Sequence, residues 1–266
     1  MRDILVRWLN KLRQNKTFRL MEGRLRFDGK RRIGVGETKK TFLRPGWETV
    51  DLVDADYFCD LRRDPLPFPD ESVDVIGAAH VVEHLDHPDA TAHFYQEAYR
   101  TLKKGGMLRI STPDADLLIE KYKEGDWWYF ISLEGLWRLR LIVRKQLPPE
   151  AILMHNLFFE WFASFSGRLD TAGGPILPKE LIDEKVNSLD AFEFSRWAAE
   201  QLPPNRVYAH VNVYAYDRLE RELKAAGFSR VVRCDFDESS DPLCTRHHID
   251  REYERRASFY AEAFKE

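Results

Sequence analysis

The sequence predicts an α/β fold with a doubly wound, mostly parallel sheet that carries a mostly helical, aromatic-rich insertion. Short apolar runs rich in Val and Ile alternate with segments of helical periodicity, which is the pattern of β-α-β units. Residues 126–205 interrupt this alternation with many aromatic side chains and several Pro and Gly residues, and the α/β pattern then resumes. These features indicate one sheet domain with one large insertion.

The predicted strands and helices follow one another along the chain. Strands are expected at residues 31–36, 47–53, 72–79, 107–111, 228–236 and 258–265, the last pairing with the strand before it. Helices are expected at 87–102, from a cap at Asp114 to Tyr122, and at 216–226. A turn is expected at 103–106, and the first two strands lie too close for a full helix between them.

Charge and composition divide the chain into three units. Residues 1–30 form a predicted amphipathic leader helix, and the first 32 residues carry eleven Lys or Arg against three Asp or Glu. Residues 31–125 and 206–266 form the predicted sheet domain, and residues 126–205 form the insertion, a candidate lid over a bound substrate. The basic leader could contact a protein or a membrane surface, or present its charge to solvent.

The composition is that of a globular protein, because 44% of the residues are hydrophobic and 32% are charged. No apolar stretch approaches the roughly 18 residues of a spanning helix, and the amino terminus lacks the pattern of a signal peptide. A cytoplasmic location is therefore expected. The three cysteines form no CxxC pair, so neither a disulfide framework nor a metal site is predicted, and no nucleic-acid partner is expected.

Ligands of doubly wound sheets bind beyond the carboxyl ends of the strands, so residues at the predicted strand ends are the candidates for a site. The first strand ends with Gly34, Val35 and Gly36, a G-x-G segment whose backbone a ligand can approach closely. This glycine segment is weak evidence alone, because G-x-G is short.

The next two loops carry acidic residues. Asp51, with Leu52 beside it, ends the second strand, and its carboxylate could accept both hydroxyl groups of a ribose; Asp54 is the nearby alternative. Asp60 and Leu61 precede the apolar segment LPFPD at 66–70. A carboxylate and a backbone amide there could bind the edge of an adenine ring, with the side chains of Leu66 and Phe68 as an apolar wall.

The strand at 72–79 leads into the segment HVVEHL at 80–85. It places His80, Glu83 and His84 within six residues at the centre of the expected crevice. Two imidazoles and a carboxylate in such a place favour proton-transfer chemistry over a purely structural role.

In this order the motifs resemble the class I S-adenosylmethionine-dependent methyltransferases, in particular a bacterial type-11-like subgroup. The resemblance rests on the glycine segment, PGWETVD at 45–51, LPFPD at 66–70, EHL at 83–85, AYRTLKKGGMLRISTPD at 98–114 and HVNVYAYDRLERELKAAGF at 210–228. It covers about half of the chain, and the ordered combination is more specific than any single motif. Two features depart from the pattern: Glu37 stands where a small residue is common, and the helix after it is shortened to a loop.

The resemblance implies a Rossmann-like methyltransferase fold and S-adenosylmethionine as the cofactor. It places the glycine segment and His80 near the methionine part of the cofactor. It places Asp51 at the ribose and Asp60 with Leu61 at the adenine.

Methyl transfer from a sulfonium requires an aligned acceptor, and a hydroxyl acceptor also benefits from a base. His84 is the first candidate for this base, with Glu83 orienting it, and His210 and His155 are alternatives. By analogy with the family, the expected acceptor is a hydroxyl group of a small molecule or a saccharide. Four tryptophans of the insertion could stack on a sugar ring or belong to the core: Trp127, Trp128, Trp137 and Trp161.

Two other interpretations are open at this point. The altered glycine segment could mark a catalytically weak or inactive methyltransferase fold that acts as a partner-binding or regulatory subunit, with the basic leader as its docking element. A nicotinamide-dependent oxidoreductase also uses glycines and a strand-end acid on such a sheet. That alternative is weaker, because the third glycine that opens a phosphate-binding helix is missing.

Overall fold

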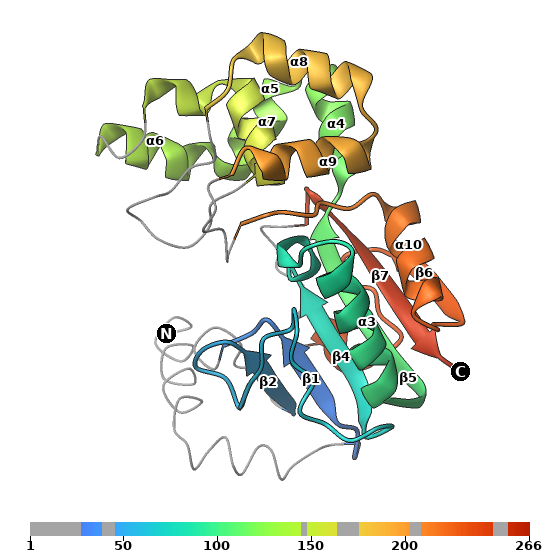
Figure 1. Ribbon diagram of the computed structural model, residues 1–266. Helices are drawn as coiled ribbons and strands as arrows, with labels where there is room; N and C mark the ends of the chain where they lie inside the picture. The colour runs from blue at the N-terminus through green and yellow to red at the C-terminus, as the bar shows by residue number, and fades with distance from the viewer. Residues whose placement is uncertain (1–27, 39–45, 145–147, 164–175, 203–208, 247–254) are drawn as a thin grey trace.

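The computed structural model describes residues 28–38, 46–144, 148–163, 176–202, 209–246 and 255–266 (Figure 1). In these residues a twisted sheet is covered by helices, and a separate group of helices stands over the edge where the parallel strands end (Figure 1). Most of the predicted leader helix at 1–30, with the protein or membrane contact predicted for it, lies outside the described residues.

The sheet has seven strands in the described part of the chain, in the order β3-β2-β1-β4-β5-β7-β6. These are β1 (Arg32–Val35), β2 (Trp47–Asp51), β3 (Tyr57–Phe58), β4 (Val73–Ala79), β5 (Leu102–Pro113), β6 (Arg230–Cys234) and β7 (Ser258–Lys265). Neighbouring strands are parallel except β7, which runs antiparallel to β5 and β6. This order is typical of class I methyltransferases, so the predicted fold class is confirmed.

Each predicted strand is present, and the differences concern β3 and β5. β3 was not predicted, because a strand of two residues has no periodicity; it extends the sheet edge by pairing Tyr57 with Val50. β5 begins earlier than expected. Residues 103–106, predicted as a turn, form an irregularity inside the strand, since Val73 pairs with Leu102 whereas Val75 already pairs with Met107.

Two helices cover the viewer's face of the sheet in Figure 1: α3 (Asp89–Thr101) and α10 (Tyr216–Ala225). Both agree closely with the helices predicted at 87–102 and 216–226. Their apolar side chains, including Phe94 and Leu219, join those of β1, β4 and β5 in the main core. Two short helices were not predicted, η1 (Val82–His84) and α11 (Pro242–Arg246).

The helical group consists of α4 (Ala115–Lys123), α5 (Trp127–Phe130), η2 (Ile131–Gly135), α6 (Leu136–Val143), η3 (Pro149–Ile152), α7 (Met154–Ala163), α8 (Lys179–Ser188) and α9 (Ala191–Glu200). α4 begins at the predicted cap, where the Asp114 side chain accepts a hydrogen bond from Leu117 N at 3.2 Å. A second core of aromatic side chains holds the group together. Within it, Phe158 stacks on Tyr122 with a centroid separation of 4.3 Å.

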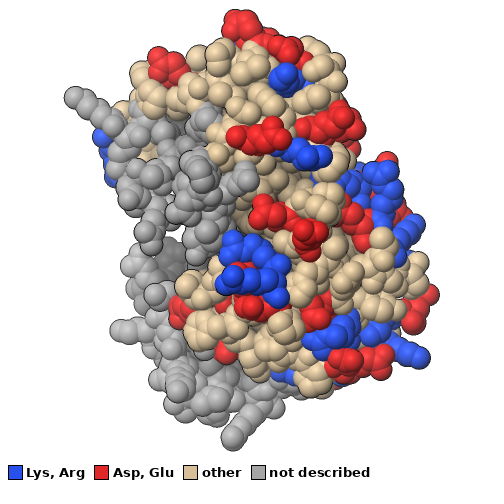
Figure 2. Space-filling view, viewed as in Figure 1, with Lys and Arg blue, Asp and Glu red and all other residues tan. Residues whose placement is uncertain are grey.

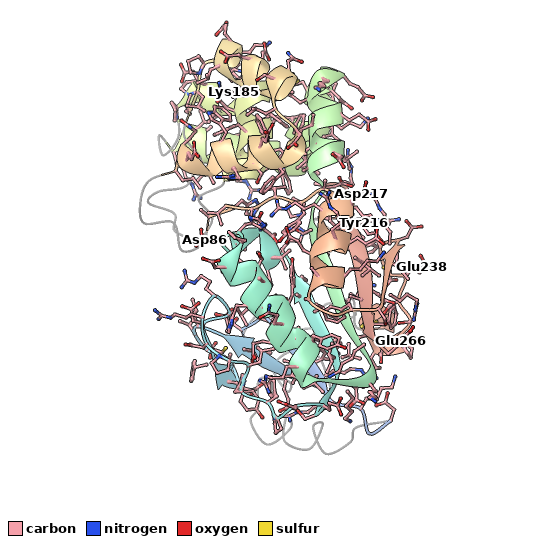
Figure 3. All side chains as sticks on the ribbon, turned by 45° about the vertical axis from the view of Figure 1, so that its right-hand side comes forward. Asp86, Lys185, Tyr216, Asp217, Glu238 and Glu266 are labelled. Carbon is pink, nitrogen blue, oxygen red and sulfur yellow. The ribbon has the colours of Figure 1, made fainter. Side chains whose placement is uncertain are left out.

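The chain returns from the helical group to the sheet through residues 209–215, and this segment joins the two parts. Val213 N donates to Ser195 Oγ of α9 at 2.7 Å, and Val211 N donates to the carbonyl of Glu83 at 2.8 Å. Figure 3 shows Tyr216 and Asp217 at the start of α10, directly below α4. The helical group is therefore fixed over the carboxyl ends of β4 and β5.

The surface in Figure 2 carries acidic and basic side chains interspersed over both parts of the molecule. None of the helices in the described part of the chain is long and apolar enough to cross a membrane.

A buried ion pair holds the amino end of β1. Arg32, only 1% exposed, donates from Nε and Nη2 to the carboxylate of Asp241 at 3.2 and 2.9 Å, and from Nη1 and Nη2 to Asp28 at 3.0 and 2.6 Å. Burial alone would raise the pKa of Asp241, but the bonds from Arg32 outweigh this effect and lower it. The carboxylate therefore stabilises the folded state in its ionised form.

We expect Asp241→Asn to lower the free energy of unfolding by about 3 kcal/mol. The substitution leaves the buried guanidinium of Arg32 with Asp28 as its remaining carboxylate partner. The pKa of Asp241 is lowered on folding, so its contribution is present above its ordinary pKa of 3.8 and is lost as the pH falls below that value. Urea unfolding at several pH values measures both effects, and the variant should show a shallower acid dependence. Asp86→Asn, at an exposed position (Figure 3), is the control; equal losses in both variants would contradict the prediction.

The turn after β1 requires a glycine for two reasons. Gly36 has φ +68°, and a Cβ atom there would lie 2.5 Å from Cγ2 of Val81. Its amide also donates to the carbonyl of Val50 at 2.8 Å, which fixes the turn against β2. Gly29 has nearly the same φ, +74°, but open space around the Cβ position.

Substitution of these two glycines by Ala distinguishes the cost of backbone strain from the cost of steric contact with Val81. Gly29→Ala should cost about 1 kcal/mol, the penalty of the left-handed conformation alone. Gly36→Ala should cost about 2 to 4 kcal/mol, because contact with Val81 is added to the same penalty. Chemical unfolding of both variants measures the difference, and equal costs would show that Val81 moves aside freely.

Candidate active site

The strand ends surround a cavity of about 220 Å³. Parallel strands present their carboxyl ends at one edge of a sheet, so residues that follow β1, β2 and β4 meet there. The cavity is lined by Gly36, Asp51, Leu52, Cys59, Asp60, Leu61, Arg62, His80, Val81, His84 and Leu85. The structure thus brings most of the sequence-predicted cofactor residues to one place, although their individual roles remain predictions.

Two of the predicted cofactor residues do not line the cavity. Gly34 and Val35 lie inside β1, paired with Thr49 and Val50 of β2, and not in the loop after the strand. Only Gly36 of the glycine segment reaches the cavity wall. Its small size is already required by the turn, so the G-x-G pattern has a structural cause as well.

Asp51 is the last residue of β2 and is half-buried in the cavity wall. Its Oδ1 accepts a hydrogen bond from Val53 N at 3.1 Å, which orients the carboxylate at the strand tip. The alternative candidate, Asp54, is exposed, has φ +47° and lies outside the cavity lining. The geometry therefore favours Asp51 over Asp54 as the residue that meets a ligand.

Asp60 is buried and already paired. Arg62 Nε and Nη2 donate to its two carboxylate oxygens at 2.8 and 2.9 Å, and these bonds lower the pKa of Asp60. Arg62 N donates to Oδ1 and Arg63 Nε lies near Oδ2, both at 3.2 Å, so these four donors match the roughly four acceptor positions of a carboxylate. Nearby, burial raises the pKa of the Cys59 thiol to about 11, which keeps the thiol protonated and unreactive.

The apolar wall differs from the predicted one. Leu66 and Phe68 lie in the main core beneath the cavity, where the ring of Phe68 packs edge-on against Tyr57. Leu61 and Leu85 line the cavity in their place. The sequence could not distinguish apolar residues that line the cavity from those that pack in the core, because both kinds occur in the same loops.

Glu83 is the buried centre of the HVVEHL segment. His80, which has φ +52°, places Nδ1 3.0 Å from Oε1 of Glu83 and Nε2 2.8 Å from Ser258 Oγ. Thr112 Oγ1 donates to Oε2 of Glu83 at 3.2 Å. Burial alone would raise the pKa of Glu83, but the surrounding imidazoles, above all His80, outweigh it and hold the pKa at about 2.

Two imidazoles from distant parts of the chain meet beside Glu83. The rings of His84 and His210 lie edge to face with centroids 5.0 Å apart. His84 Nδ1 lies 3.0 Å from the carbonyl oxygen of Ala209, and His210 Nδ1 lies 2.7 Å from that of Trp161. Burial, with His84 nearby, lowers the pKa of His210 to about 4, so its ring is neutral near pH 7.

The other candidates from the insertion lie elsewhere. His155 is on α7, where its charged neighbours, Lys179 and Asp183, belong to α8, and it does not line the cavity. Trp127 and Trp128 contact each other at the surface, and Trp128 is 73% exposed. The buried Trp161 belongs to the aromatic core, and the side chain of Trp137 lies outside the described part of the chain.

Three polar residues of the site were missed by the sequence analysis. Thr112 lies near the carboxyl end of β5, and Ser258 opens β7, which starts at the same edge because it runs antiparallel. No sequence motif around Arg62 marked it as a residue of the site. A search of every strand end for polar side chains would have found Thr112, whereas Ser258 required the strand pairing.

Residues 38–110 match the family model described as a methyltransferase domain. The match begins at residue 38, just after the glycine segment. The two departures from the family pattern, Glu37 and the shortened helix, lie at this same point of the chain. No curated protein sequence matches the chain.

Solved structures of three proteins are similar to this chain. A S-adenosylmethionine-dependent methyltransferase of Thermotoga maritima, titled a possible histamine N-methyltransferase, is 15% identical with a TM-score of 0.43, covering 99% of this chain and 96% of that one. A methyltransferase of Mesorhizobium loti is 13% identical with a TM-score of 0.42, covering 95% and 99%. One of Archaeoglobus fulgidus is 15% identical with a TM-score of 0.38, covering 98% and 99%.

The strand order of the sheet distinguishes a methyltransferase from a nicotinamide-dependent oxidoreductase. A dinucleotide-binding sheet has the strand order 3-2-1-4-5-6, whereas here the antiparallel β7 is inserted between β5 and β6. The nicotinamide-dependent oxidoreductase is therefore disfavoured. Residues 38–110 thus match a methyltransferase domain, and the sheet has the strand order typical of class I methyltransferases.

Proposed function

We propose that this enzyme transfers the methyl group of S-adenosylmethionine to a hydroxyl oxygen of a small molecule or a saccharide. One observation carries the proposal: the imidazole of His84 lines the cavity, and its Nδ1 is bonded to the carbonyl of Ala209. Nε2 is thereby left as the basic atom of the ring. Methylation of a hydroxyl group releases a proton, and an imidazole is the side chain best suited to assist its removal near neutral pH.

The residues of the cavity fit the cofactor, which supplies an electrophilic methyl group on a positively charged sulfur. Asp51 presents a carboxylate to ribose hydroxyls, and Asp60 lines the cavity where the amino group of adenine would replace one of its present donors. Leu61 and Leu85 provide an apolar surface for the ring. In this proposal Gly36 and His80 lie on the methionine side, and Gly34 and Val35 act only by placing them.

The helical group provides the acceptor side in this proposal. It stands over the carboxyl edge of the sheet (Figure 1), and its Trp161 carbonyl holds His210 beside His84. An acceptor bound between the helical group and the sheet would be shielded from water, which favours transfer to the acceptor over transfer to solvent. Glu83 and His210 keep the His84 ring in place.

Asp51→Asn should weaken binding of S-adenosylmethionine and S-adenosylhomocysteine about 10- to 100-fold, because a charge-assisted hydrogen bond is worth about 1.5 to 3 kcal/mol. Calorimetric titration of the full chain measures the affinities, with Asp54→Asn as the matched control. Equal effects of the two substitutions would remove Asp51 from its proposed place. Absence of binding to a folded wild-type chain would instead favour the regulatory-subunit interpretation.

His84→Gln should lower turnover about 100-fold or more while changing the cofactor affinity little, because an acid–base side chain contributes roughly that factor to the rate. Release of S-adenosylhomocysteine with a panel of saccharide and phenolic hydroxyl acceptors measures turnover. His93→Gln, on α3 and outside the cavity lining, is the control. Unchanged turnover in His84→Gln would reject the assignment.

A further inference from the structure

Three side chains converge on one point, and one of them, His84, lines the cavity. Glu83 and His84 come from η1, and His210 comes from the returning segment, more than a hundred residues later in the chain. One carboxylate oxygen and one ring nitrogen of each histidine all lie within 4.8 Å of one another. Such a set of donor atoms requires an explanation beyond packing, because buried polar groups usually point toward partners.

Each of the two rings is oriented by a hydrogen bond between its Nδ1 and a main-chain carbonyl. A carbonyl oxygen can only accept, so Nδ1 of His84 carries a proton toward Ala209 and Nδ1 of His210 carries one toward Trp161. The Nε2 atoms are then the lone-pair donors. Metal-binding histidines show this arrangement, in which the second nitrogen donates to a carbonyl that fixes the ring and its tautomer.

The carboxylate of Glu83 is oriented in the same way. Thr112 donates to one oxygen at 3.2 Å, and His80 lies 3.0 Å from the other. The side chain is fully buried, and burial of an ionised carboxylate is unfavourable unless it is paired or binds a cation. Every one of the three donors is thus held by an outer partner.

We propose that Glu83, His84 and His210 bind a divalent transition-metal ion, with an open coordination position for the acceptor oxygen. Two imidazoles and one carboxylate form a donor set of catalytic zinc sites, which keep a position free for water or substrate. Donors of such an ion lie roughly 3.4 Å apart, so the atoms need to approach by at most about 1.5 Å, which small side-chain rotations provide. His84 lines the cavity, so an ion can enter from it.

The role of the ion rests on the proposed function, whereas its binding does not. An acceptor hydroxyl bound to the ion loses its proton more readily, because the positive charge stabilises the alkoxide. The proton passes to water, and the oxygen takes the methyl group while the electron pair of the broken carbon–sulfur bond stays on sulfur. With the ion bound, Nε2 of His84 is a ligand and the ion activates the hydroxyl; in the metal-free chain the same Nε2 is the base.

Cobalt(II) is a suitable probe, because its visible absorption reports coordination by nitrogen and oxygen. The full wild-type chain, stripped of metal with a chelator, should bind one equivalent saturably. His210→Asn and Glu83→Gln should each weaken binding at least tenfold. The control is a double variant at His247 and His248, adjacent in the sequence and outside the described residues, changed to Asn; it should bind like wild type.

X-ray absorption of the wild-type cobalt complex gives a test that needs no variant, and two imidazole ligands are expected. No saturable binding, a complex without imidazole ligands, or loss of binding in the His247 and His248 double variant would each overturn the proposal. S-adenosylhomocysteine binding is measured in parallel. A chain that binds the cofactor but not cobalt loses the metal site alone, whereas one that binds cobalt but not the cofactor loses the proposed function.

Discussion

The contact between the returning segment and Glu83 is the constraint on which the site depends. The carbonyl of Glu83 accepts hydrogen bonds from Val211 N at 2.8 Å and Asn212 N at 3.2 Å, and the Asn212 side chain is bonded in turn by Arg218 of α10. These bonds fix a segment from the far end of the helical group on top of η1. They bring His210 beside the histidine that follows Glu83. Without them the sheet part and the helical group would each keep a core but share no site.

Much of the sheet could be predicted from the sequence, because its strands are apolar runs that end in Gly, Asp or His. The parts that could not be predicted are those where pairing overrides local pattern. β3 (Tyr57–Phe58) exists only as a partner of β2, and β5 absorbs Gly105 and Gly106, a turn signal, as an irregularity inside the strand. The aromatic residues of 126–205 predicted helices correctly, since most of them form the second core.

The residues that line the cavity could be predicted from the sequence better than the surroundings of His210. Asp51 ends β2 and His80 directly follows β4, so the rule that ligands bind at strand ends was enough to select both for the cavity wall. The rule failed for Gly34, which is paired inside β1, and the predicted apolar wall failed for Leu66, which packs in the main core. The neighbourhood of His210 could not be read from the sequence, because its partners depend on how the helical group returns to the sheet.

The hydrogen bond from His210 to Trp161 has a consequence for how this enzyme can diverge. Its acceptor is a main-chain oxygen, which every amino acid provides, so the side chain at position 161 can change while the bond persists. The same holds for the bond from His84 to Ala209. The helices above the cavity can therefore be rebuilt over evolutionary time for new acceptors while the imidazoles keep their orientation, and alignment of related chains would show neither partner as invariant.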